Sequence, residues 1–245
     1  MIFDVELGEN FRQKARYVED GHLTEAPAAL PYSTVVARDS IQILIMITVL
    51  NNLDIQCADI QNVFLTASNL ERCYIIAGPE FMDEEGKCFI VRRALYGLKS
   101  AAQAFRSFWA KNLEDLNFHS SEADPDIWMK VAVKPDGEEY YEYILCYVDD
   151  ILCLSVDAND VMESLAKKFK FKNDKIEPPG SYLGACVRSK TIDSCTMWAL
   201  SSQDYVEAAV KNVQETVKEK RWNLPKKATT PMVGITNRNW TDHPN

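Results

Sequence analysis

Two adjacent carboxylates, Asp149 and Asp150, lie at the centre of an otherwise apolar stretch, residues 143–154. The β-branched and aromatic residues on either side predict two strands joined by a tight turn, with both aspartates at its tip. Because both faces of the first strand are apolar, we expect the hairpin to be buried in a sheet that is covered on both sides. Two carboxylates about 4 Å apart repel by roughly 4 kcal/mol at an effective dielectric near 20. A divalent cation with oxygen ligands is the usual means of offsetting such repulsion.

A third carboxylate, Asp59, favours a metal site over the alternative, a solvated turn in which Asp is a common residue. Asp59 ends a strand face that is otherwise apolar from Leu53 to Cys57. A carboxylate at the end of a buried strand needs a partner or a metal ion. If this strand lies beside the hairpin, the three aspartates form a site for two metal ions. Such a pair stabilises the attacking and leaving oxygens in phosphoryl transfer.

Amphipathic helices are predicted around these strands. The first begins at Asp39 or Ser40, which are good N-cap residues, and ends near Asn52. The second follows Ser100, and its aromatic stripe is interpreted as core. The third begins after Asp157. Their apolar faces are expected to contain Ile41, Leu44, Ile45 and Thr48 in the first helix, Ala101, Phe105, Phe108, Trp109 and Leu116 in the second, and Val161, Leu165 and Phe169 in the third.

The last third of the chain is predicted to contain two strands and a long helix. Residues 182–187 and 196–200 have strand patterns, and Asp136-Gly137 predicts a turn in an earlier hairpin. Ser201 and Asp204 predict a capping box at the start of the helix. One face of this helix is expected to contain Val206, Val210, Val213 and Val217.

Composition favours an intracellular globular protein. The chain has 245 residues, of which 47% are hydrophobic and 26% charged. Its longest apolar run, residues 41–50, is too short for a membrane span of about 20 residues. The N-terminus has no basic segment of the signal-peptide type. Seven scattered cysteines without a CxxC pair indicate reduced core residues and argue against a zinc site.

The net charge of −9 opposes binding to nucleic acid, which usually requires a basic surface. Lysines and arginines nevertheless gather in three places, and each group is either a local binding groove or simply a solvated helix face. The first group is Arg92, Arg93, Lys99, Arg106 and Lys111; the second is Lys167, Lys168, Lys170, Lys172 and Lys175; the third is Lys218, Lys220, Arg221, Lys226 and Lys227.

Five ordered blocks make the chain resemble the reverse transcriptases of copia-type (Pseudoviridae) long-terminal-repeat retrotransposons, from about residue 11 to residue 232. A lone tetrapeptide such as Tyr147-Val148-Asp149-Asp150 is a weak signal, whereas five blocks in the family's order are specific. The other four blocks are residues 58–65 (ADIQNVFL), 94–99 (ALYGLK), 121–126 (SEADPD) and 178–184 (PPGSYLG).

The resemblance implies an α+β fold of the right-hand polymerase type, with fingers, palm and thumb and an antiparallel palm sheet backed by helices. We expect fingers at residues 1–32 and 67–98, palm at 33–66 and 99–190, and a thumb-like region with a tail at 191–245. Ribonuclease H and integrase regions are expected in a parent polyprotein and have no counterpart in these residues, so a fragment or a solitary domain is expected. The expected location is cytoplasmic, in a virus-like particle, or nuclear.

The implied activity is RNA-directed DNA synthesis, with Mg²⁺ (or Mn²⁺ as a substitute), dNTPs and a primed RNA or DNA template, and with no membrane. Asp59, Asp149 and Asp150 are the expected catalytic residues, and they would hold the metal ions together with the carbonyl of Ile60. The nucleotide-binding residues implied are Lys14, Arg16, Asn62, Val63, Phe64, Tyr96, Gly97 and Lys99. The primer-binding residues implied are Tyr147, Val148, Tyr182, Leu183 and Gly184.

Two alternatives stay open at this point. The chain could be a catalytically inactive or co-opted copy that acts as a binding or scaffold protein, which its acidic charge favours and its three aspartates oppose. Phe64 could exclude the ribose 2′-hydroxyl or could be a core residue. Strand alternation between Val63 and Leu65 would turn Phe64 to the opposite face, which favours the first role.

Overall fold

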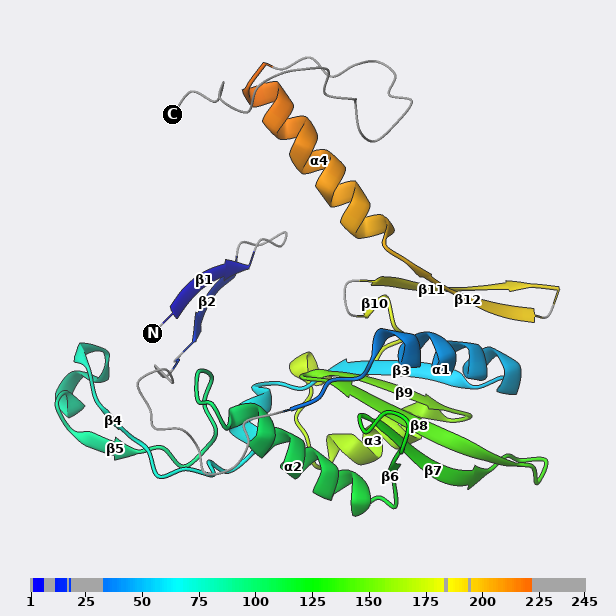
Figure 1. The fold of residues 1–245 in the computed structure, drawn as a ribbon, viewed down its shortest axis with the longest axis horizontal. Helices are drawn as coiled ribbons and strands as arrows, with labels where there is room; N and C mark the ends of the chain where they lie inside the picture. Colours follow the sequence, from blue (N-terminus) through cyan, green and yellow to red (C-terminus); the bar gives the residue numbers. More distant parts are fainter. Residues whose placement is uncertain are drawn as a thin grey trace, which may run out of the picture. The chain divides into compact units, whose positions relative to one another are not determined.

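A computed structural model of the chain describes residues 2–6, 12–16, 18, 33–182, 185–193 and 195–221, with backbone alone for 2–6, 12–16, 181, 195 and 196. Contacts divide the chain into two compact units, residues 1–200 and 201–245. The first unit contains the central sheet and its covering helices (Figure 1). None of the described helices is long and apolar enough to cross a lipid bilayer.

Five antiparallel strands form the central sheet, in the order β3-β9-β8-β7-β6. Strands β8 (Glu139–Tyr147) and β9 (Asp150–Ser155) are the predicted hairpin, and β3 (Asp54–Asp59) pairs with β9 along its whole length. Strand β7 (Ile127–Val133) joins β8 through a turn with Gly137 at φ 91°, as the Asp136-Gly137 pair predicted. Strand β6 (His119–Ser120) forms the other edge.

Helices cover both faces of the hairpin, as predicted. Helix α1 (Arg38–Asn51) lies on one face, and helices α2 (Ala101–Glu114) and α3 (Ala158–Ala166) lie on the other (Figure 1). Alternate residues of β8 and β9 divide between the two resulting cores: Leu145 and Leu152 pack with α1, whereas Ile144 and Ile151 pack with α2 and α3. All four of these side chains are at most 1% exposed.

The buried face predicted for α1 is confirmed, because Ile41, Leu44, Ile45 and Thr48 are all buried. The predicted cap is wrong. The helix begins after Ala37, which supplies no capping side chain, and neither Asp39 nor Ser40 is the N-cap. Asp124, from the loop before β7, accepts hydrogen bonds from the Ala37 N–H (3.0 Å) and from the Ser40 hydroxyl (2.6 Å). A distant carboxylate therefore takes the place of a local cap.

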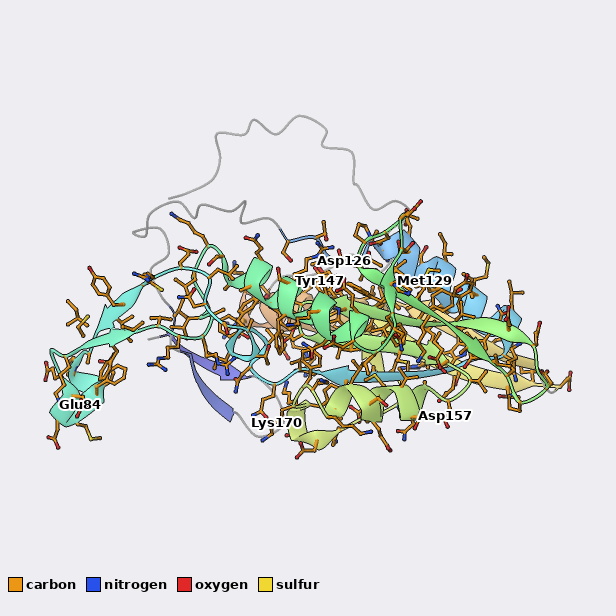
Figure 2. All side chains as sticks on the ribbon, turned by 90° about the horizontal axis from the view of Figure 1, so that it is seen from below. Glu84, Asp126, Met129, Tyr147, Asp157 and Lys170 are labelled. Carbon is orange, nitrogen blue, oxygen red and sulfur yellow. The ribbon has the colours of Figure 1, made fainter. Side chains whose placement is uncertain are left out.

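The aromatic stripe of α2 is core, as predicted, because Phe105 and Trp109 are buried and Trp109 packs against Phe169 at a ring distance of 5.1 Å. Asp157 caps α3 as predicted, since its carboxylate accepts the Asp160 N–H at 3.0 Å. Figure 2 shows Asp157 at the start of this helix and Lys170 beyond its end.

Two further two-stranded sheets belong to the first unit. Strands β1 (Ile2–Glu6) and β2 (Arg12–Arg16) form one hairpin, and β4 (Tyr74–Ile76) and β5 (Cys88–Ile90) form another. Glu84 lies in the segment that joins β4 to β5 (Figure 2). Short 3-10 helices occupy Val63–Thr66 (η1), Pro79–Glu84 (η2) and Lys172–Asp174 (η3).

The strands predicted at 182–187 and 196–200 have different bounds in the structure. A three-stranded sheet contains β10 (Ser181–Tyr182), β11 (Ala185–Ile192) and β12 (Cys195–Ser201). The last helix, α4 (Gln203–Glu219), belongs to the second unit. Its predicted capping box is wrong, because the N-cap is Ser202 without a capping hydrogen bond; the Ser201 hydroxyl accepts the Gln203 N–H instead.

The mixed α+β class with an antiparallel sheet is thus present as predicted. The assignment of residue ranges to fingers, palm and thumb stays a prediction.

Replacing Asp124 tests whether this carboxylate stabilises the start of α1. Asp124→Ala should lower the free energy of unfolding by about 1–2 kcal/mol, because it removes the acceptor of two partly buried hydrogen bonds at the start of α1. Burial tends to raise the pKa of Asp124, but hydrogen bonds from Ser40, Ala37 and Asp126 and the charge of Arg106 lower it below its ordinary 3.8. The stabilisation should be complete above that pH and should be lost at lower pH, as the carboxylate takes up a proton.

Urea unfolding of the parent and the variant at pH 7 and pH 3 measures this difference. Glu122→Ala, which truncates an exposed carboxylate of the same loop, is the control and should leave the stability unchanged. An equal loss in both variants would contradict the capping role.

Candidate active site

The hairpin tip differs from the prediction by one residue. Tyr147 pairs with Asp150, so the turn consists of Val148 and Asp149, and Asp150 is already the first residue of β9. Val148 has φ 59°, in the left-handed region, which is an outlier for a β-branched residue and implies local strain. Because the pairing continues up to Asp150, its carboxylate is fixed by the sheet, whereas Asp149 lies in the turn.

Strand β3 brings the third aspartate to the same edge. Asp59 is the direct partner of Asp150 in the antiparallel pairing of β3 with β9. The next residue, Ile60, donates its N–H to the carbonyl of Asp149 at 2.7 Å. Antiparallel partners have Cα atoms about 4.5–5.5 Å apart. The three aspartates predicted from the sequence therefore come from neighbouring backbone positions.

Lys172 contacts this cluster, and the sequence analysis missed its role. Its ammonium Nζ lies 3.1 Å from Oδ2 of Asp59. The two residues are 113 positions apart, so no local pattern connects them. The available signal was the lysine-rich segment after α3, which was interpreted only as a possible basic surface.

The carboxylates suit a hard cation chemically, although they do not converge. Among the described residues, no three Asp, Glu, His or Cys side chains form a ready-made metal cluster. Burial and the charges of Asp149 and Asp59 raise the pKa of Asp150 from 3.8 to about 6, against an opposing effect of Lys172. This crowding of negative charge is what a divalent ion with oxygen ligands would relieve. The donor set thus fits Mg²⁺ or Mn²⁺ with Asp59, Asp149 and Asp150 as ligands.

A pocket of about 240 Å³ opens beside Asp59 and Asp150. Tyr182 lies in its wall and is only 4% exposed. Cys57 also lines it, and burial followed by the charges of Glu177 and Asp150 raises the pKa of its thiol to about 11. The thiol is therefore protonated at neutral pH and is not a metal ligand in that form. Leu183 and Gly184, predicted to contact the primer with Tyr182, lie outside the described residues.

A second pocket of about 240 Å³ lies at the hairpin tip, with Val148 in its wall. Phe64, Phe105 and Val148 line it, and the Phe64 ring packs edge-to-face on Tyr96 at a centroid distance of 4.7 Å. The structure thus brings Phe64 and Tyr96 together with Val148. The strand alternation argument for Phe64 is wrong, however, because η1 replaces a strand at these residues. Phe64 is half-buried, Val63 is fully buried and Leu65 is 40% exposed.

The other predicted nucleotide-binding residues have the following positions in the structure. Asn62 precedes η1 with φ 54°, and the exposed Gly97 has φ 94° in the turn after Tyr96. Lys99 is half-buried. Lys14 and Arg16 belong to β2, but their side chains lie outside the described part of the structure.

A family model described as reverse transcriptase (RNA-dependent DNA polymerase) matches residues 4–226 of the chain. The chain belongs to the reverse transcriptase family. The family predicted from the five sequence blocks is confirmed. The match spans β3, the hairpin and the segment that contains Lys172, so the three aspartates lie inside the reverse transcriptase domain.

Two curated relatives of this reverse transcriptase domain are polyproteins. The chain is 29% identical over 170 residues to the retrovirus-related Pol polyprotein from transposon RE1 of Arabidopsis thaliana, and 29% identical over 169 residues to that from transposon RE2 of the same plant. Each alignment covers 66% of this chain and 11% of the relative. The aligned part of the chain thus corresponds to about a tenth of each relative's length.

Neutralising Asp150 tests whether the neighbouring carboxylates of Asp59, Asp149 and Asp150 destabilise the fold. Because its folded pKa is raised, the parent should lose stability as the pH rises from about 4 to about 6, where the folded carboxylate is forced to ionise. Asp150→Asn should abolish this loss and be more stable than the parent at pH 7.5 by about 1 kcal/mol, a value reduced for solvent screening of a half-buried group.

Urea unfolding in EDTA between pH 4 and pH 7.5 measures the difference. Asp83→Asn, in the exposed segment between β4 and β5, is the control and should follow the parent at every pH. A variant that is less stable than the parent at pH 7.5 would contradict the prediction.

Proposed function

We propose that the chain is an RNA-directed DNA polymerase of a copia-type retrotransposon, which transfers nucleotides from dNTPs to a primer 3′-hydroxyl. One observation carries the proposal: Asp59 and Asp150 are paired across β3 and β9, directly beside the turn that contains Asp149. Membership of the reverse transcriptase family and the similarity to transposon Pol polyproteins support it.

The reaction joins the primer to the α-phosphate of the incoming nucleotide. The 3′-hydroxyl gives up its proton to solvent as its oxygen attacks this phosphorus, the bond from the phosphorus to the oxygen that bridges to the β-phosphate breaks, and pyrophosphate leaves. Asp59, Asp149 and Asp150, with the carbonyl of Ile60, would hold Mg²⁺ ions, which supply charge neutralisation at the attacking and leaving oxygens. The protein's own contribution is orientation of the two substrates, because catalysis of this transfer is mainly positioning and electrostatics.

The two pockets suit the two substrates. The incoming nucleotide would enter the pocket lined by Phe64 and Val148, with Tyr96 packed against Phe64. The N–H groups of Asn62 and Val63 stand at the start of η1, where a helical turn leaves its donors without partners, and would meet the triphosphate. Gly97 would allow close approach of the template base, and Lys14, Arg16 and Lys99 would neutralise phosphates.

The primer end would contact Tyr147 and Val148 from the hairpin and Tyr182 from β10, with Leu183 and Gly184 next to it. Tyr182 supports this assignment, because it lines the same pocket as Asp59 and Asp150. The template would be RNA or DNA. Ribonuclease H and integrase activities would belong to other parts of a parent polyprotein, which would act in a cytoplasmic virus-like particle or in the nucleus.

A non-catalytic binding or scaffold role is the second candidate. The observation that favours it is the ion pair between Asp59 and Lys172, which occupies one of the carboxylates that would hold a metal ion. Primer extension distinguishes the two candidates.

Asp149→Asn tests the catalytic role with little risk to the fold, because Asp149 lies in the turn and loses a charge that repels Asp150. Extension of oligo(dT) on poly(rA) with dTTP and Mg²⁺ should fall by at least about a hundredfold, since a ligand of the Mg²⁺ that neutralises the reacting phosphate is removed. Extension at the parent rate by the variant, or none by the parent, would count against the proposal.

The control is Asp83→Asn, which removes the same charge from an exposed segment of the chain and should extend the primer at the parent rate. Circular dichroism of each variant checks that the fold is retained. Loss of extension in the control as well would show that net charge, rather than the carboxylate of Asp149, decides the rate.

Phe64→Ala tests whether this ring excludes ribonucleotides. A ring against the C2′ of the sugar leaves no room for a hydroxyl, and its removal should relieve a clash. Relief of about 1.4 kcal/mol or more would raise the ratio of ribo- to deoxyribonucleotide incorporation by about tenfold or more. Because Phe64 is half-buried against Tyr96, its truncation should also cost about 1–2 kcal/mol of stability.

Phe64→Tyr retains the ring and is the matched control, with an incorporation ratio close to that of the parent. Single-nucleotide insertion of rTTP and dTTP gives the ratio for the parent and both variants. An unchanged ratio in Phe64→Ala, together with a large loss of thermal stability, would mean that Phe64 is a core residue.

A further inference from the structure

The segment from Phe171 to Glu177 runs along the free edge of β3 and is tied to it at both ends. Ile60 and Phe171 form a β-bridge, and Gln61 donates its N–H to the carbonyl of Lys170 at 2.9 Å. At the other end, Cys57 and Glu177 exchange two backbone hydrogen bonds of 2.8 and 3.1 Å. We call residues 171–177 the edge strap.

Between its two ends, the edge strap turns away from β3 and presents two lysines. Asn173 and Asp174 have φ 57° and 52°, so the backbone makes a tight reversal there rather than continuing as a strand. Lys172 and Lys175 stand on either side of this reversal, and both line the pocket that contains Asp59 and Asp150. Lys172 forms an ion pair with Asp59 at 3.1 Å, and Lys175 forms one with Glu177 at 4.0 Å.

From this arrangement we propose that Lys172 is an internal counter-ion that competes with the divalent metal ion for Asp59. The inference rests on the proposed function, because it takes Asp59 as a metal ligand. Lys172 would occupy one ligand oxygen, Oδ2 of Asp59, while the site holds no metal. Binding of the metal ion would then require this ion pair to separate.

The exposure of the pair sets the strength of the competition. The side chains of Lys172 and Asp59 are 45% and 34% exposed, so water screens their attraction. An exposed pair of this kind shifts an equilibrium by only about two- to fivefold. That is enough to reduce the charge repulsion at the hairpin tip, yet too little to exclude a divalent ion that several carboxylates can bind. The ammonium therefore partly neutralises the metal-free site without blocking it.

The test is direct binding of Mn²⁺, measured from the EPR signal of the free ion in the absence of nucleotide and primer. Lys172→Gln should bind Mn²⁺ about two- to fivefold more tightly than the parent, because the competing pair is removed. Lys175→Gln is the matched control. It removes the same charge from the same strap and the same pocket, without touching Asp59, and should change the affinity less than Lys172→Gln. Lys172→Arg keeps the positive charge and should bind like the parent.

Three results would overturn the inference. Unchanged or weaker binding in Lys172→Gln would mean that the ion pair does not compete with the metal. Equal increases in Mn²⁺ affinity in Lys172→Gln and Lys175→Gln would assign the effect to the net charge of the pocket. Absence of Mn²⁺ binding in every variant would overturn both this inference and the metal site of the proposed function. The predicted order of affinities without primer extension would overturn the polymerase assignment alone, and the competition would stand.

Discussion

Negative charge concentrated at the edge of a sheet that is apolar on both faces is the constraint on which the rest of the structure depends. Asp59 and Asp150 cannot move apart, because the pairing of β3 with β9 fixes them opposite each other and the buried side chains on both faces fix the pairing. The repulsion is reduced by partial exposure, by Lys172 and by the tendency of Asp150 to hold a proton. None of these removes the charge, and the edge is left able to receive a cation.

At the opposite end of the same hairpin, a buried carboxylate has both an ion-pair partner and a hydrogen-bond donor. Glu142 of β8 is 7% exposed and forms an ion pair with Lys130 at 2.8 Å. It also accepts a hydrogen bond from the Ser155 hydroxyl at 2.9 Å. In a carboxylate that is paired and hydrogen-bonded in this way, the partners offset the cost of burying the charge. The two ends of the β8–β9 hairpin thus differ in charge. The carboxylate of Glu142 at one end is paired, whereas the carboxylates at the other end remain incompletely neutralised.

Local patterns predicted the hairpin, its burial on both faces, the apolar face of α1 and the cap of α3, because each depends on residues close together in the chain. The β-branched and aromatic residues on either side of Asp149 and Asp150 predicted the hairpin, and alternation between Tyr143 and Val148 predicted its two buried faces. The contacts that the sequence could not predict are long-range. Asp124 stabilises the start of α1 from 87 residues away, and Lys172 reaches Asp59 across 113. The 3-10 turn at Val63 was missed for another reason: its apolar residues fit a strand equally well, and only the backbone reversal at Asn62 decides between the two.

The left-handed backbone of Val148 couples the strain of the turn to the width of the pocket beside Phe64, and these two properties are separate at most positions. Its left-handed φ costs about 1–3 kcal/mol in a β-branched residue, and its side chain also forms part of the wall of the pocket beside Phe64. A smaller residue, glycine above all, would relax the turn and at the same time widen that pocket. A bulkier side chain would narrow the pocket and keep the strain. Substitution at this one position therefore changes the strain of the turn and the size of the pocket together, and neither property can be optimised there without a change in the other.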